Sequence, residues 1–69
     1  MESNWLVDLM YSDESGSLYQ TEIVVPAQDE IEAEQRAEEK LIKDDPRMSV
    51  IQRICKGMAN FPTHLAAHL

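Results

Sequence analysis

Two segments near the start of the chain have the pattern of β-strands: the first is apolar on both faces except for Asp8, and the second alternates apolar and polar residues with a period of two. These segments are residues 5–11 and residues 18–25. Residues 12–17 between them combine serines, acidic residues and Gly16, a composition typical of a tight turn. The pattern therefore predicts an antiparallel β-hairpin, which limits the rest of the chain to elements that can cover a small sheet.

Four residues of this hairpin could serve more than one purpose. Trp5, Tyr11 and Tyr19 have the size and amphipathic character of interface anchors, but in so small a protein we expect them in the core. Asp8 lies among apolar residues of the first segment. It is either a buried acid or, as is more common, a charge on an edge strand that blocks aggregation.

The residues after Pro26 change to a composition of strong helix formers. Pro26 should end the second strand because proline cannot donate to a strand ladder, and residues 28–43 should form a helix. Pro46 then stops the helix, since residues before proline avoid the α-helical region. One apolar row with i, i+4, i+8 spacing should dock on the sheet, because small side chains allow a close approach. The row consists of Ala33, Ala37 and Leu41.

The last ordered element predicted is a third strand. Residues 48–55 are β-branched and apolar, and Gly57 should mark the strand's end. An isolated hairpin is marginally stable, so the helix should pack on one face of the sheet. The sequence therefore predicts a single α+β domain over residues 1–69, with a three-stranded antiparallel sheet and the order β-β-α-β. Residues 64–69 either form a short C-terminal helix capped by Thr63 or remain a frayed tail.

The charge of the chain is strongly acidic and unevenly distributed. Thirteen acidic residues oppose six basic ones, for a net charge of −7 over 69 residues, and all the acidic residues lie within residues 1–45. Nucleic-acid affinity depends on basic side chains, so we expect no direct nucleic-acid binding. No apolar run approaches the roughly 20 residues of a membrane span, and the first residues lack a basic signal region. We therefore expect a cytoplasmic protein without membrane contact.

A second helical row carries three glutamates, and it is the candidate partner-binding site. The row consists of Glu30, Glu34 and Glu38. Their like charges repel at a cost of a few tenths of a kcal/mol per pair, and forming a helix does not require glutamates at these positions. They are either a solvated surplus of acid or, with the neighbouring Ile31 and Ile42, a surface for a basic partner protein. Two oppositely charged i, i+4 pairs predict that the other side of the helix is solvated: Glu32 with Arg36, and Glu39 with Lys43.

Few residues suggest catalysis or metal binding. His64 and His68 have a spacing that suits metal ligands on a helix, but a closed site would need further ligands that nothing fixes in place. Cys55 lies in an apolar segment and is expected to be a small core residue. There is no phosphate-binding glycine loop, metalloprotease helix or paired cysteine motif. We therefore predict that the protein is not an enzyme and has neither cofactor nor metal.

In its small size, its acid-rich helix over residues 29–39 and its β-β-α-β order, the chain resembles a class of small acidic host-inhibitor proteins. Phages and mobile elements use these proteins to disable host machinery, and anti-CRISPR proteins belong to the class. The resemblance implies a non-enzymatic inhibitor that occupies a nucleic-acid-binding surface on a host protein, for instance as a DNA mimic. Carboxylates about 6 Å apart along the helix come close to the spacing of DNA phosphates.

A small homo-oligomeric structural or accessory subunit is the alternative function. Below about 70–80 residues a single core rarely contributes more than about 3–5 kcal/mol, so small folds often need an additional stabilising contact. With one cysteine, the chain cannot form an internal disulfide. Self-association would supply the missing stabilisation, and a homodimer would use a strand edge or the helix side that carries Ile31 and Ile42.

Overall fold

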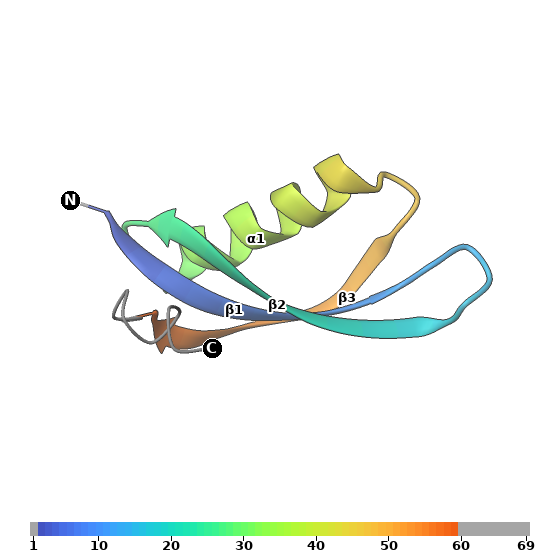
Figure 1. Cartoon of the computed structure of the whole chain (residues 1–69), viewed down its shortest axis with the longest axis horizontal. Coiled ribbons are helices and arrows are strands. Elements are labelled where there is room, and N and C mark those ends of the chain that lie inside the picture. The colour runs from blue at the N-terminus through green and yellow to red at the C-terminus, as the bar shows by residue number, and fades with distance from the viewer. Residues whose placement is uncertain (1, 60–69) are drawn as a thin grey trace, which may run out of the picture.

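The structure, a computed structural model, describes residues 2–59, which form one helix and three strands in the order β-β-α-β (Figure 1). The elements are β1 (Ser3–Ser12), β2 (Leu18–Ala27), α1 (Glu30–Asp44) and β3 (Ser49–Met58). The sheet is antiparallel with the strand order β2-β1-β3, so β1 is the central strand. The predicted α+β fold is confirmed. The predicted C-terminal helix, with Thr63 as its cap, lies outside the described residues.

The hairpin of β1 and β2 is long and regular. Its register runs without interruption from the pair Ser12 and Leu18 to the pair Ser3 and Ala27. Gly16 in the turn has a φ of 88°, a conformation that glycine adopts without steric cost. Its N–H donates to the carbonyl oxygen of Asp13 at 3.1 Å. The turn projects beyond the part of the sheet that α1 covers (Figure 1).

The prediction that Pro26 ends the second strand is wrong. β2 continues through Pro26, which pairs with Asn4 of β1, and it ends at Ala27. The physical reason is the strand order: β2 is an edge strand, paired on one side only. An edge strand tolerates proline where the missing N–H faces away from the neighbouring strand.

The third strand extends to Met58, further than its pattern predicts, and it contains two bulges. Its register against β1 shifts between Met10 and Tyr11 and again between Leu6 and Val7. At these shifts β3 has one extra residue, Ile51 at the first and Lys56 at the second. Gly57 follows the second bulge with a φ of 124°, so this glycine bends the strand instead of ending it.

Side-chain caps define the start of α1, and a backbone hydrogen bond defines its end. Asp29 is the N-cap, and its Oδ1 accepts a hydrogen bond from the backbone N–H of Glu32 at 2.8 Å. Glu32 reaches back, and its Oε1 accepts from the backbone N–H of Gln28 at 2.8 Å. This reciprocal arrangement resembles a capping box, and it starts the helix two residues later than composition predicts. At the other end, Asp45 N–H donates to the carbonyl oxygen of Leu41 at 3.0 Å.

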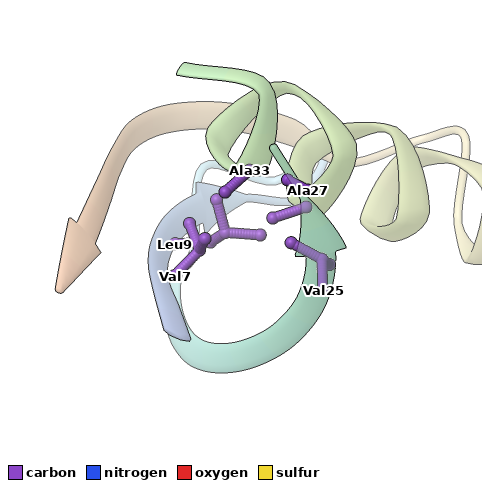
Figure 2. Close-up of a cluster of buried hydrophobic side chains, with 6 residues drawn as sticks. Val7, Leu9, Val25, Ala27 and Ala33 are labelled. Atoms are coloured by element: carbon purple, nitrogen blue, oxygen red, sulfur yellow. The ribbon is translucent and has the colours of Figure 1, made fainter. Parts of the chain in front are cut away.

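The core lies between α1 and the hairpin. Figure 2 shows Ala33 of α1 lying over side chains of β1 and β2 that point toward the helix. Six hydrophobic residues are buried: Val7, Leu9, Val25, Ala27, Ala33 and Ala37. The two alanines therefore form the docking face that their spacing predicts, and Leu41 packs half-buried at its margin.

Of the three aromatic residues expected in the core, only Trp5 packs there. Trp5 is half-buried against the core, and its Nε1–H donates to the carbonyl oxygen of Ala27 at 2.9 Å. Tyr11 and Tyr19 instead stack on each other, with ring centroids 5.5 Å apart, toward the hairpin turn. Tyr19 is exposed.

The contact of α1 with the sheet requires a small side chain at Ala33. We predict that Ala33→Leu destabilises the protein by about 1–3 kcal/mol, because the added atoms have no space at a fully buried position. For a domain of this size each kcal/mol lowers Tm by about 4–8 °C. The control is Gln35→Leu, which introduces the same side chain at an exposed position of the helix. Thermal unfolding that gives equal Tm values for the two variants would contradict this packing.

Candidate partner-binding surfaces

One margin of α1 is attached to β2 and to the start of the chain through Arg36. Its Nη1 donates to the carbonyl oxygen of Pro26 at 2.8 Å and to Oε2 of Glu2 at 2.6 Å. The bond to Glu2 raises the pKa of Arg36. The predicted ion pair with Glu32 is also present, at 3.6 Å. The other predicted pair, Glu39 with Lys43, is not among the ion pairs that the described residues form.

The opposite margin of α1 is attached to β3, and here two of the three predicted site glutamates take part. Oε2 of Glu34 accepts a hydrogen bond from the backbone N–H of Cys55 at 3.0 Å, in a half-buried position. Oε1 of Glu38 accepts from Nη1 of Arg53 at 2.8 Å. Cys55 lies next to the bulge at Lys56, where the strand ladder is interrupted. Glu34 thus supplies an acceptor to the backbone at an irregular point of the strand.

The structure places the five predicted site residues on one helix, with different surroundings. Glu30 and Ile31 are exposed in the first turn, and the Ile31 side chain is 68% exposed. Ile42 is half-buried beside a hollow of about 450 Å³ between α1 and β3. The other residues that line this hollow are Gln35, Glu38, Glu39, Lys43 and Arg53. Glu34 and Glu38 already have partners in the chain, so the row is not uniformly solvated.

Sequence reasoning missed the two β3 residues that hold this row, Arg53 and the backbone of Cys55. One signal was available. At 100° per residue, Glu34 lies about 20° from Leu41 around the helix, which places it at the edge of the docking face. A carboxylate at that angle is within reach of the strand below it. The partner itself could not be named, because it depends on the position of β3 in the sheet.

After internal pairing, most of the acid still lacks a cationic partner. The described residues form five ion pairs, which involve four of the six basic residues. Five carboxylates take part: Glu2, Glu22, Glu32, Glu38 and Asp45. Within residues 2–59, the other eight of the 13 carboxylates therefore have no cation within ion-pair distance. Only two basic residues of this part of the chain, Lys40 and Lys43, form no ion pair. The molecule presents an excess of negative charge.

The hairpin turn holds one carboxylate in a dense set of hydrogen bonds. Oδ1 of Asp13 accepts from the backbone N–H groups of Ser15 and Ser17, at 2.9 and 3.0 Å, and from Oγ of Ser15 at 2.6 Å. Oδ2 accepts from the hydroxyl of Tyr19 at 2.8 Å. The bonds from Ser15 and Tyr19 favour the ionised form and lower the pKa of Asp13 from 3.8 to about 2. The same contact raises the pKa of Tyr19.

The position of Asp8 differs from both interpretations of its sequence context. Asp8 lies in the central strand, so the edge-strand interpretation is wrong, and the residue is half-buried instead of buried. It lies on the sheet face away from α1, where Nε2 of Gln20 donates to both of its carboxylate oxygens at 3.1 and 2.9 Å. On the same face, Nζ of Lys56 contacts Oε2 of Glu22 at 3.1 Å, and this contact raises the pKa of Lys56.

Residues 2–59 contain no group of three His, Cys, Asp or Glu side chains placed to hold a metal ion. His64 and His68 lie outside the described residues. Cys55 has a free, half-buried thiol, and no polar side chain within this part of the chain is buried. The hollows beside α1 and beside the hairpin turn are open to solvent. The helix of this part of the chain is too short and too polar to cross a membrane.

Comparison with known proteins gives no relative from which a function could be transferred. No family model matches the chain, and neither a curated protein nor a solved structure matches it significantly. The surfaces described above are therefore the basis for assigning a function.

Glu34 is predicted to stabilise the fold although it belongs to the candidate site. Glu34→Ala should cost about 1 kcal/mol or more, because the backbone N–H of Cys55 would lose its acceptor in a half-buried position. The matched variant is Glu39→Ala, which removes the same side chain from an exposed position of the same helix. Urea unfolding should separate the two variants. Equal midpoints would mean that the bond to Cys55 contributes nothing to stability.

The hydrogen bonds of the hairpin turn should be detectable through the pKa of Asp13. We predict that the carboxyl carbon of Asp13, followed by NMR, titrates with a midpoint near pH 2. Ser15→Ala and Tyr19→Phe should each raise the midpoint toward 3.8, because each removes a donor to the carboxylate. The folded-state pKa is lower than the unfolded value, so this stabilisation is complete above about pH 4 and is lost as the pH falls through about 2. A wild-type midpoint near 3.8 would contradict the hydrogen bonds.

Proposed function

We propose that the protein is a non-enzymatic inhibitor that binds a partner protein at a basic surface used for nucleic acid. The observation that supports the proposal best is the excess of carboxylates that remains after internal pairing. Four of the six basic residues are already engaged by the chain's own acids. A partner rich in lysine and arginine would supply the cations that the chain itself does not.

Electrostatic attraction of this kind acts before contact. Complementary charge raises association rates by about 10- to 1,000-fold, and the effect weakens as salt screens it over about 8 Å at physiological ionic strength. A nucleic-acid-binding groove concentrates positive charge in a concave surface. An acidic protein of this size can occupy such a groove and exclude the nucleic acid, with no chemical step.

The contact surface in this proposal is the side of α1 that borders the hollow beside β3. Exposed Ile31 and half-buried Ile42 lie there among the carboxylates. Protein interfaces usually have an apolar core surrounded by a polar rim, and apolar side chains among carboxylates fit this arrangement. Glu30 has no partner among the described residues, and Glu38 has only one of its two oxygens engaged, by Arg53. Both carboxylates can still accept from a partner's cation.

The proposal depends on the local charge of this side of α1 and not on a phosphate-like spacing. Glu34 and Glu38 turn toward β3, so these carboxylates do not form a free row along the helix. An inhibitor that competes by charge needs no such row. It does need access to the nucleic-acid-binding proteins of the cell, and the cytoplasm is the compartment that we propose.

The test uses a variant that removes charge from the proposed surface and keeps the fold. Glu30→Gln combined with Glu38→Gln leaves the bond from Glu34 to Cys55 intact, and glutamine can still accept from Arg53. Tagged wild-type protein should capture a nucleic-acid-binding protein from lysate at low salt, and this double variant should capture much less of it. Purified partner should then release its nucleic acid when the wild-type protein is added.

The matched control is Glu14→Gln combined with Asp44→Asn. It removes the same two charges from exposed positions that have no ion pair among the described residues. The control should bind as the wild type does, with a similar dependence on salt. Two results count against the proposal: capture of no nucleic-acid-binding protein at low or physiological salt, or equal loss of binding in both double variants.

A further inference from the structure

Within residues 2–59, α1 covers one face of the sheet and no element covers the other (Figure 1). This second face carries apolar side chains from all three strands. The register places Leu6 opposite Val24, and Ile54 of β3 opposite Asp8, on this uncovered face. Val24 is 39% exposed and Ile54 is 47% exposed. We name this surface the open sheet face and define its apolar residues as Leu6, Met10, Leu18, Val24 and Ile54.

We propose that a second copy of the chain covers the open sheet face, so that two sheets pack face to face in a homodimer. This inference is independent of the proposed inhibitor function. It assigns a different surface and a different partner, and the side of α1 that carries Ile31 and Ile42 remains available in the dimer.

The distribution of charge favours a second copy on this face. The chain has a net charge of −7, so two copies repel each other through most of their surfaces. On the open sheet face, the carboxylate of Glu22 is paired with Lys56, and that of Asp8 is held by Gln20. Asp8 keeps its negative charge, so of these three charged side chains only one negative charge is left without a cationic partner, against −7 for the whole chain. Two acidic copies therefore repel each other less through this face than the charge of the whole chain implies.

The size of the face also suits a dimer. Three strands of ten residues cover about 480 Å², from a spacing of about 4.8 Å between strands and about 3.3 Å per residue. Treated as flat, the two faces would together bury about 960 Å². The accessible surface is larger, because side chains project from the sheet. The total reaches the roughly 1,000 Å² that a specific interface needs. Two sheets would lie about 10 Å apart, as in a β-sandwich.

The strand edges are less suited to pairing with a second copy. On β3, bulges at Ile51 and Lys56 interrupt the regular spacing of edge groups, and the carboxylate of Glu34 already occupies the N–H of Cys55. On β2, Pro26 lacks an N–H. Bulges, proline and covering side chains are the devices that prevent edge-to-edge association. These devices act at the strand edges, and they leave the open sheet face as the candidate surface for a second copy.

The test measures the oligomeric state of the full chain by sedimentation equilibrium. Wild type should be a dimer at about 50 μM, and Ile54→Lys should weaken the dimer at least about tenfold, because it brings two lysines into the interface. The matched control is Ile31→Lys, which places the same charge on an exposed isoleucine of α1 and should leave the dimer intact. Circular dichroism checks that each variant is folded.

A second measurement covers the case in which Ile54→Lys does not fold. In NMR spectra of the wild type, dilution should shift amide signals of the open sheet face and leave those of the exposed side of α1 unchanged. Three results would overturn the proposal. They are a wild-type monomer up to about 1 mM, loss of the dimer in Ile31→Lys but not in Ile54→Lys, or dilution shifts confined to α1. If the wild type is a monomer, something other than a second copy covers the open sheet face, such as residues 60–69 or a different protein.

Discussion

The contact of Ala33 and Ala37 with the sheet is the constraint on which the rest of the structure depends. Both side chains are fully buried between the helix and the sheet, and because each is a single methyl group, the backbone of α1 lies close to the strands. At that distance Arg36 reaches the carbonyl oxygen of Pro26 on one margin, and Glu34 reaches the N–H of Cys55 on the other. Bulkier residues would lift the helix and separate both sets of partners.

The sequence predicts the elements of this fold well because their signals are local. The hairpin follows from an apolar segment and an alternating segment on either side of a turn, and the docking face of α1 follows from the spacing of Ala33 and Ala37. The errors concern strand order and register, which depend on residues far apart in the chain. Pro26 lies inside a strand because β2 is at an edge, and Asp8 is central because β3 pairs on the other side of β1.

For the candidate site, the sequence predicts the acidic residues but not their contacts, because the contacts also depend on residues far apart in the chain. The sequence shows that acid exceeds base and that glutamates recur along one side of the helix. It does not show which charges are neutralised inside the molecule, since Arg53 lies 15 residues after Glu38 and Lys56 lies 34 residues after Glu22. Lys56 is also the extra residue at a bulge of β3, which the sequence does not mark. For this chain, a structure is therefore needed to tell which carboxylates are paired internally and which remain available to a partner.

The central position of β1 also has a consequence for folding during synthesis. β1 and β2 are neighbours in the chain and can pair as soon as both have left the ribosome, but β3 follows after the whole of α1. Until β3 arrives, the second edge of β1 is unpaired, and the glutamates of α1 that bind β3 have no partner. The last described strand thus completes the sheet and adds the contacts of Glu34 and Glu38 to a helix that already packs on the hairpin. Chains that end before β3 would expose a long unpaired strand to their neighbours.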